Sequence, residues 1–256
     1  MRVTVYGHTG TVGRQLFRWL GEVGLDPSGM SLDDTWGEPG AEDWAFLCLP
    51  TPTTEDGQDL SAIEEVAEFL GDGERHVVIR STVLPGTCAR IQDEHPEWWV
   101  YHWPEFLSAR SAWEDFCEPQ VYVIGGDGLE WLATGWEDIL PNPSHWSVYT
   151  DLKTAELIKY AHNCHGAMQV IFANLLRDAA DKCGADWTHL MQGVLRQGYV
   201  SPETVSAYWN VEQDGYRGYG GACFPKDVDA MRHWLAGKAE LLDGMAAANA
   251  RLRGEA

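Results

Sequence analysis

The sequence predicts an α/β fold, in which a doubly wound parallel sheet over residues 1–150 is followed by an all-helical domain over residues 151–256. In the first part, short apolar runs alternate with amphipathic stretches. This alternation is typical of parallel strands covered by helices on both faces. After Pro141-Asn142-Pro143 the spacing becomes helical, and the proline-free stretch from Thr154 to Cys183 predicts an unusually long helix.

Short apolar runs predict the strands, at residues 3–6, 30–32, 44–49, 76–79, 98–101 and 121–124. These runs are followed by residues that favour turns, such as Gly7 after the first and Pro50 to Thr54 after the third. Helices are expected where apolar residues recur every three or four positions, at residues 14–23, 60–70, 154–183, 186–195 and 239–253. Asp59 or Ser61 is placed to cap the second of these helices.

The composition argues against some classes of partner. The chain has 256 residues, with 39 acidic and 18 basic side chains and a formal net charge of −21. This negative charge disfavours nucleic acids and anionic membranes, because both are polyanions. A small anionic ligand remains compatible with it, since a helix N-terminus can bind one. No apolar stretch approaches the roughly 20 residues that a membrane helix needs.

The six cysteines contain no Cys-x-x-Cys pair, and no secretory signal follows Met1. Both observations are typical of reduced thiols in a cytoplasmic protein. We expect Cys48, Cys117 and Cys183 to be buried as small apolar side chains. A further group, His162, Cys164 and His165, does not share one helix face, so we predict no metal site.

Three glycines, Gly7, Gly10 and Gly13, lie between the first strand and the first helix. Glycine allows a tight turn and a close approach of the backbone to a pyrophosphate, and the helix N-terminus, with Thr11 and Val12, then faces the negative charge. The spacing is GxxGxxG, one residue longer than the commoner GxGxxG. It predicts a Rossmann-type dinucleotide site, with a purely structural turn as the alternative.

An acidic residue at the end of the second strand is expected to bind the ribose hydroxyls of such a dinucleotide. Asp33 lies 20 residues past Gly13, and the neighbouring Asp34 fits equally well. Because no Arg or Lys follows closely, we predict NAD as the cofactor in preference to NADP.

Five further blocks follow one another in the chain: Leu49 to Thr53, Ser81 to Thr87, Pro104 to Leu107, Ala155 to Asn163 and Gly218 to Asp227. Together they resemble the UDP-glucose/GDP-mannose dehydrogenase family, and the last block, GYGGACFPKD, is the most specific. The resemblance covers nearly the whole chain. Family members carry a further C-terminal domain, and this chain ends at Ala256, where that domain is expected to begin.

The resemblance implies an NAD-dependent, four-electron oxidation of a sugar's primary alcohol to a carboxylate, with a nucleotide sugar as the substrate. Cys223 matches the nucleophile that forms a thiohemiacetal and then a thioester, a role that suits a thiol. Lys159 and Asn163 match groups that stabilise an oxyanion, and their spacing puts both on one face of the predicted helix. Asp227 matches an acid that positions water.

The same pattern assigns Glu105 to hydrolysis of the thioester and Thr82 to holding the catalytic water. Beyond the glycine turn and Asp33, the implied cofactor contacts are Pro50, Thr51, Thr82 and Lys226. The implied substrate contacts are Glu105, Phe106, Leu107, Lys159, Asn163, Tyr219, Gly220 and Cys223. The family also implies a homodimer formed through the long helix.

Several positions depart from the family pattern. Trp103 stands before Pro104 where an Asn is usual, and Ala109-Arg110 replace a Glu-Gly pair. Arg110 is therefore a candidate ligand for a phosphate or carboxylate. The arginine that normally reaches a partner subunit has only Arg217 as a nearby match.

Two other functions stay open at this point. One is a two-electron dehydrogenase of the 3-hydroxyacid type, which has the same two-domain plan and uses a helical Lys and Asn but does not need Cys223. The other is a non-catalytic NAD-binding protein.

Overall fold

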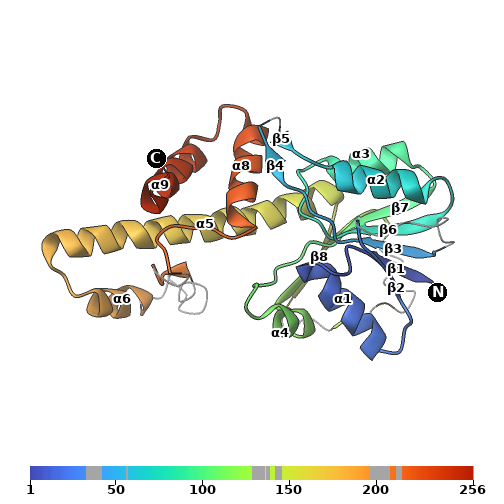
Figure 1. The fold of residues 1–256 in the computed structure, drawn as a ribbon, viewed down its shortest axis with the longest axis horizontal. Coiled ribbons are helices and arrows are strands. Elements are labelled where there is room, and N and C mark those ends of the chain that lie inside the picture. Colours follow the sequence, from blue (N-terminus) through green and yellow to red (C-terminus); the bar gives the residue numbers. More distant parts are fainter. Residues whose placement is uncertain are drawn as a thin grey trace. The chain divides into compact units, whose positions relative to one another are not determined.

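A computed structural model describes residues 1–32, 42–55, 57–128, 136, 139–141, 146–196, 208–211 and 215–255. The chain divides into two compact units, Met1–Lys159 and Tyr160–Ala256. The long helix α5 (Leu152–Cys183) contributes its first residues to unit 1 and the remainder to unit 2 (Figure 1).

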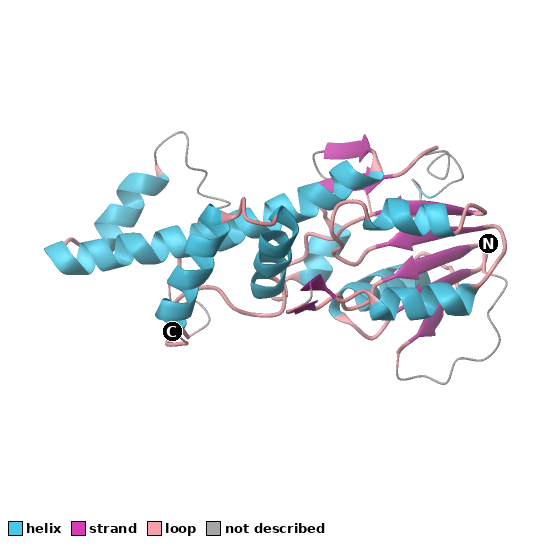
Figure 2. Ribbon diagram, turned by 90° about the horizontal axis from the view of Figure 1, so that it is seen from above, coloured by secondary structure: helices cyan, strands magenta, loops and turns pink. Residues whose placement is uncertain are grey.

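Unit 1 is built on a seven-stranded sheet with the order β2-β1-β3-β6-β7-β8-β9 (Figure 2). The strands are β1 (Val3–Tyr6), β2 (Ser28–Met30), β3 (Trp44–Leu47), β6 (Arg75–Ile79), β7 (Trp98–His102), β8 (Val121–Gly125) and β9 (Trp146–Thr150). Among the described residues of this sheet, β7 and β8 pair antiparallel and the other neighbouring strands pair in parallel. The strand order reverses between β1 and β3, which is where doubly wound sheets bind ligands.

Helices cover both faces of the sheet (Figure 1). α1 (Thr11–Glu22) and α4 (Ala112–Cys117) lie on one face, and α2 (Ser61–Leu70) and α3 (Thr87–Glu94) lie on the other. Along β3, Trp44 and Phe46 pack into the core cluster that contains α1 and α4, whereas Leu47 packs into the cluster that contains α2 and α3. Successive side chains of a strand point to opposite faces, so burial of both faces requires the continuous apolar run seen in the sequence.

The described secondary structure of unit 2 is entirely helical. Besides its part of α5, it contains α6 (Trp187–Leu195), α8 (Phe224–Leu235) and α9 (Glu240–Arg253). Asp186 caps α6, because its carboxylate accepts a hydrogen bond from the N–H of His189 at 2.7 Å. None of the helices in the described ranges has both the length and the apolar composition needed to cross a membrane.

The predicted strands and helices are confirmed, with ends that differ by a few residues, and the sheet is confirmed as doubly wound. The structure adds α3, α4, α8, β9 and a small hairpin of β4 (Thr53–Thr54) and β5 (Gly57–Gln58). β9 escaped prediction because it is an edge strand with largely exposed side chains, and so has no buried apolar run. The sequence did not predict α8, because this helix begins just after a glycine-rich stretch that is typical of a loop.

One buried carboxylate joins α5 to the loop before α3. Glu156 is fully buried, and its two oxygens accept hydrogen bonds from the N–H groups of Gly86 at 2.6 Å and Cys88 at 2.7 Å. Burial raises the pKa of the Glu156 carboxyl, although both N–H groups favour its ionised form. These donors belong to the first turn of α3, where the backbone has no partner of its own.

We predict that Glu156→Ala destabilises unit 1, because each N–H left buried without an acceptor costs about 1–3 kcal/mol. Urea unfolding followed by tryptophan fluorescence measures the loss. The matched control is Glu68→Ala, at an exposed position of α2. Equal stability of the two variants would contradict the role given to Glu156.

Candidate active site

The glycine turn joins β1 to α1 so closely that two of its glycines admit no side chain. Gly7 has φ +79°, and a Cβ there would lie 2.3 Å from the carbonyl oxygen of Cys48. A Cβ on Gly13 would lie 2.2 Å from the carbonyl oxygen of Gly7. Gly10 is the N-cap of α1, and no side chain caps the helix. The first N–H groups of α1, beginning with that of the exposed Thr11, therefore have no capping side chain and can bind an anion. The close approach of the backbone at Gly7 and Gly13 suits the pyrophosphate of a dinucleotide.

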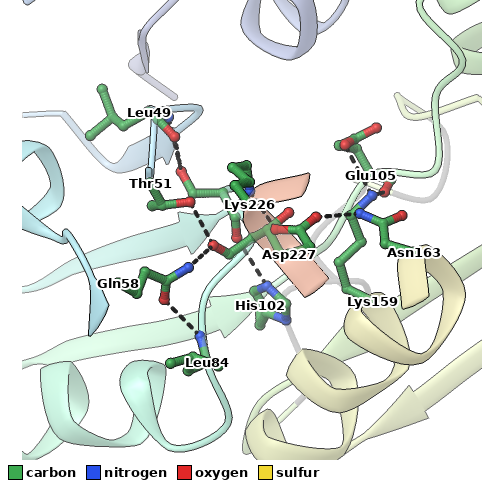
Figure 3. Close-up of polar contacts among 12 residues, drawn as sticks. Leu49, Thr51, Gln58, Leu84, His102, Glu105, Lys159, Asn163, Lys226 and Asp227 are labelled. Atoms are coloured by element: carbon green, nitrogen blue, oxygen red, sulfur yellow. Dashed lines mark hydrogen bonds and ion pairs between the residues drawn. The ribbon is translucent and has the colours of Figure 1, made fainter. Parts of the chain in front are cut away.

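The side chains of Thr51 and Gln58, which Figure 3 labels, both bond to the backbone of Thr82, just after β6. The carbonyl oxygen of Thr82 accepts hydrogen bonds from Thr51 Oγ1 at 2.7 Å and from Gln58 Nε2 at 2.9 Å. Gln58 also accepts a hydrogen bond from the N–H of Leu84 at 3.0 Å. The ends of β3 and β6 are thus tied together beside the glycine turn. Thr51 and Thr82 are both buried, whereas Pro50 is exposed.

Ser81 and His102 continue this tie to β7. Ser81 Oγ accepts a hydrogen bond from the N–H of Leu49 at 2.9 Å and lies 2.8 Å from the carbonyl oxygen of Leu49. His102 Nε2 lies 3.3 Å from the carbonyl oxygen of Ser81. Burial, together with Lys159 and Arg80, lowers the pKa of His102 to about 4, so its imidazole is neutral at pH 7. Sequence reasoning did not select Gln58, Ser81 or His102, since a hydrogen-bond partner from a distant strand leaves no local pattern.

Glu105 and Lys159 form a buried ion pair. Lys159 Nζ lies 3.1 Å from Glu105 Oε1 and donates a hydrogen bond to the Glu105 carbonyl oxygen at 2.6 Å. The Lys159 side chain is 4% exposed and that of Glu105 is 11% exposed. The second carboxylate oxygen accepts a hydrogen bond from the N–H of Leu107 at 2.7 Å. Burial opposes ionisation of Glu105, but Lys159, the Leu107 N–H and Arg80 outweigh it and lower the pKa of the carboxyl. Lys159 Nζ also lies 5.4 Å from the centroid of the Phe106 ring.

Trp103 packs against the buried guanidinium of Arg80. The Arg80 guanidinium is 3% exposed and stacks on the Trp103 ring at 3.7 Å from its centroid. Its Nε and Nη1 atoms are buried with no hydrogen-bond partner among the described residues. Burial lowers the pKa of Arg80, while Glu105 and Cys48 act in the opposite direction. Trp103 therefore supplies a ring face to a buried cation that has no ion-pair partner among the residues that the structure describes.

In unit 2, Asp227 is the centre of a second polar group. It is 1% exposed and accepts hydrogen bonds from Asn163 Nδ2 and Lys226 Nζ, each at 2.5 Å. Asn163 projects from α5, and Lys226 and Asp227 belong to the first turn of α8. These two donors satisfy the hydrogen-bonding needs of the buried Asp227 carboxylate.

Cys223 directly precedes α8 and is exposed. Its carbonyl oxygen accepts the first helical hydrogen bond, from the N–H of Asp227 at 3.0 Å. Cys223 is therefore the N-cap residue of α8, next to the positive end of the helix dipole. Tyr219 is buried and Gly220 half-buried in the loop that leads to it.

The other cysteines lie in different surroundings. Burial raises the pKa of the Cys48 and Cys164 thiols to about 12 and that of Cys88 well above its usual range. Cys48 and Cys117 are half-buried, whereas Cys183 is exposed. The expectation that Cys183 is buried is thus wrong. Cys183 is the final residue of α5, and residues 181–186, at this end of the helix and just after it, are all exposed.

The remaining sequence-based candidates fall into three groups. Asp33 and Asp34 lie outside the described residues, so the ribose contact stays a prediction. Arg110 is exposed. Arg217 is engaged within its own unit, where its guanidinium donates to Asn174 Oδ1 at 2.9 Å and to Asp178 Oδ1 at 2.6 Å. Within the described ranges, no group of three or more His, Cys, Asp or Glu residues is placed to hold a metal ion.

Two family models match the chain. Residues 32–136 match the NAD binding domain of the UDP-glucose/GDP-mannose dehydrogenase family, and residues 153–251 match the central domain of the same family. The glycine turn precedes the first matched range.

Named relatives match about three quarters of the chain. The UDP-glucose 6-dehydrogenase of Rickettsia conorii is 34% identical over 200 residues, which are 75% of this chain and 44% of that protein. The UDP-glucose 6-dehydrogenase AglM of Haloferax volcanii is 30% identical over 210 residues, 74% of this chain and 47% of that protein. The chain therefore spans about half the length of the curated relatives it matches.

Solved structures share the fold. A UDP-glucose dehydrogenase from Pyrobaculum islandicum superposes with a TM-score of 0.81 at 26% identity, over 97% of this chain and 67% of that one. A UDP-D-ManNAc dehydrogenase from Pyrococcus horikoshii superposes with a TM-score of 0.78 at 19% identity, over 98% of this chain and 69% of that one. This second likeness concerns the fold alone.

The buried ion pair predicts a pH dependence of stability. The pKa of Glu105 is lower in the folded than in the unfolded chain. The ion pair therefore contributes its full stabilisation of the folded state at pH values above the pKa of an unfolded glutamate, about 4.3. That contribution is lost as the pH falls through the lower, folded value. In Glu105→Gln, the buried Lys159 ammonium loses its counter-charge, which costs about 3–5 kcal/mol at pH 7.

Urea unfolding of the two proteins between pH 7 and pH 3 measures this difference. The gap in unfolding free energy should narrow as the pH falls, because protonated Glu105 resembles glutamine. Glu68→Gln, on the exposed side of α2, should leave the parent's pH profile unchanged. If the difference in unfolding free energy between the parent and Glu105→Gln stays constant down to pH 3, Lys159 does not lower the pKa of Glu105.

Proposed function

Because this chain belongs to the UDP-glucose/GDP-mannose dehydrogenase family, as the matches to two of its domains show, we propose that it oxidises the primary alcohol of a nucleotide sugar to a carboxylate with NAD. The oxidation removes four electrons in two steps, through an aldehyde. One observation carries the proposal. The polar residues that match the family pattern pair within each unit: Lys159 with Glu105 in unit 1, and Asn163 with Asp227 in unit 2.

All the proposed cofactor contacts except Lys226 lie in unit 1. The Gly7–Gly13 turn and the uncapped start of α1 suit the pyrophosphate, and Asp33 or Asp34 is proposed for the ribose. Thr51 and Thr82 lie at the carboxyl ends of neighbouring strands, where ligands of this fold bind, and Pro50 and Lys226 follow from the family pattern. NAD, when bound, supplies the acceptor for one hydride in each step. No Arg or Lys follows Asp33 closely, which supports NAD over NADP.

Cys223 is proposed as the nucleophile of the second oxidation. Its thiolate adds to the carbonyl carbon of the aldehyde, forming a C–S bond and placing the negative charge on oxygen. Loss of a hydride from that carbon, with reformation of the C=O bond, leaves a thioester. Water then adds to the thioester, the C–S bond breaks, and the acid and the Cys223 thiol are released. The position at the start of α8 supports this role, because the helix dipole favours a thiolate there.

The other polar groups are assigned to charge and to water. Lys159 is proposed to stabilise the oxyanion that forms at each addition, with Asn163 as a second donor. Glu105, held ionised by Lys159, is proposed to accept a proton from the hydrolytic water, with Thr82 and Asp227 helping to position it. Phe106, Leu107, Tyr219 and Gly220 are proposed substrate contacts, and Arg110 a ligand for a phosphate or carboxylate.

The domain organisation follows the same proposal. Residues 1–150 would bind NAD, and residues 151–256 would carry the catalytic Lys and Cys and form a homodimer through α5. The apolar side chains Leu157, Phe172 and Leu175 are exposed on this helix, and an exposed apolar surface of this kind favours a partner. A cytoplasmic location with reduced thiols is part of the proposal.

The number of NADH molecules formed per substrate tests the reaction. With purified protein, NAD and a panel of UDP-sugars, GDP-sugars and sugar phosphates, we expect two NADH for each substrate consumed. Cys223→Ser should lower acid formation more than about 100-fold, because the nucleophile is lost. Cys183→Ser is the matched control, since Cys183 is also exposed.

One NADH per substrate, unaffected by Cys223→Ser, would replace the proposal with a two-electron dehydrogenase on a smaller hydroxy acid. Binding of NAD without turnover of any compound in the panel would instead favour a non-catalytic NAD-binding protein.

Sedimentation velocity tests the homodimer. Leu175 is 61% exposed on α5, and Leu175→Glu should weaken the dimer at least about tenfold, because a charge would be buried in an apolar contact. Leu241→Glu, at a position 67% exposed on α9, should leave the dimer intact. A monomeric parent, or equal effects of both substitutions, would count against α5 as the interface.

A further inference from the structure

One side chain fastens the glycine-rich loop before α8 to the helix α9. Asn249 is 9% exposed, and its Oδ1 accepts a hydrogen bond from the N–H of Tyr219 at 2.7 Å. Its Nδ2 donates to the carbonyl oxygen of the same residue at 3.0 Å. A carboxamide has an acceptor and donors on one group, so it can pair with a residue as a neighbouring strand does. Only one orientation of the amide satisfies both bonds.

The chain around Tyr219 is shaped to admit this amide. Gly218 has φ +80°, and a Cβ at this position would lie 2.4 Å from Asn249 Oδ1. Glycine is therefore needed for the backbone conformation and for the close approach. The Tyr219 side chain is 4% exposed and packs in a core cluster with Ala167, Val228 and Met245. Backbone and side chain of Tyr219 are thus both held within unit 2.

The residues before Tyr219 have separate attachments. Arg217 is bound to Asn174 and Asp178 of α5, and the Arg253 guanidinium lies 3.9 Å from the centroid of the Tyr216 ring. After Tyr219, the loop becomes exposed from Gly221 to Cys223 and then enters α8. Tyr219 is the buried residue from which this exposed segment departs.

We propose that Asn249 is a positioning residue for Cys223. The inference rests on the proposed function, in which Cys223 is the nucleophile. Asn249 sets the start of the four-residue step from Tyr219 to Cys223, which spans at most about 14 Å, while α8 sets its end. Fixing both ends limits the positions that the thiol samples. A nucleophile held in this way needs less reorganisation to reach the carbonyl carbon, and a displacement of about 1 Å can cost 100-fold in rate.

The variants Asn249→Ala and Asn249→Asp test this role. The first removes both hydrogen bonds, and the second keeps the acceptor for the Tyr219 N–H but loses the donor at neutral pH. Arg251→Ala is the matched control, because Arg251 is exposed two residues further along α9. The readout is the rate of alkylation of Cys223 by iodoacetamide, determined by peptide mass and divided by the rate for the exposed Cys183 of the same molecule. Hydrogen exchange of residues 218–223 is measured in parallel.

In Asn249→Ala, we expect the loop to open locally. The ratio of the Cys223 alkylation rate to the Cys183 alkylation rate should then change by about tenfold, and hydrogen exchange of residues 218–223 should accelerate. Asn249→Asp should give a smaller change in the same direction, and Arg251→Ala none. In a turnover assay, kcat should fall about 10–100-fold while KM for NAD stays within twofold, because all the proposed cofactor contacts except Lys226 lie in unit 1.

A ratio and an exchange rate within twofold of the parent in both Asn249 variants would overturn the proposal. So would equal acceleration at Cys223 and Cys183 with a lower Tm, since that result describes a general loss of stability. If Asn249→Ala does not fold, Asn249→Asp decides alone. Neither alkylation nor exchange requires turnover, so a failure of the proposed function is distinguishable from a failure of this one.

Discussion

The Glu105–Lys159 ion pair is the constraint on which the candidate site of unit 1 depends. Both side chains are almost completely removed from water, and a charge in such a place is tolerated only with a partner. The pair joins the segment after β7 to α5, so the same contact that neutralises the charges also fixes the part of α5 that belongs to unit 1 against the sheet. Glu156 adds a second attachment, three residues earlier on α5, to the loop before α3. The orientation of α5 in unit 1 is therefore decided by buried polar contacts as well as by apolar packing.

The carboxyl ends of β3, β6 and β7 are organised by hydrogen bonds between side chains and backbone. Thr51 and Gln58 converge on Thr82, and Ser81 connects Leu49 with the strand that bears His102. Strand ends leave backbone groups without ladder partners, and these side chains satisfy them. These bonds connect the carboxyl ends of β3, β6 and β7, and β3 borders the place where the strand order reverses. Connected strand ends suit a site that must hold a cofactor and water in fixed positions.

In unit 2, the candidate site residues are held by contacts of loops and helix ends. Asp227 gathers Asn163 and Lys226, and Asn249 holds the loop that leads to Cys223. The exposed thiol thus lies between a fixed residue, Tyr219, and a helix N-terminus. Cys48, Cys88 and Cys164 lie instead where burial raises their thiol pKa values, so the fold separates one exposed thiol at a helix start from several inert ones. Exposure by itself does not distinguish the nucleophile, because Cys183 is exposed too.

The sequence by itself determined the doubly wound sheet, the long helix and the residue types of the candidate site, because each leaves a local pattern. Apolar runs such as Trp44–Leu47 mark strands buried on both faces, and the spacing of Lys159 and Asn163 marks one helix face. Only the tertiary structure decided which groups pair. The Trp103–Arg80 stack, the hold of Gln58 on Thr82 and the bond between Asn249 and Tyr219 join residues 23 to 30 positions apart. Such contacts depend on how strands and helices pack, and packing acts through space with no fixed spacing along the chain.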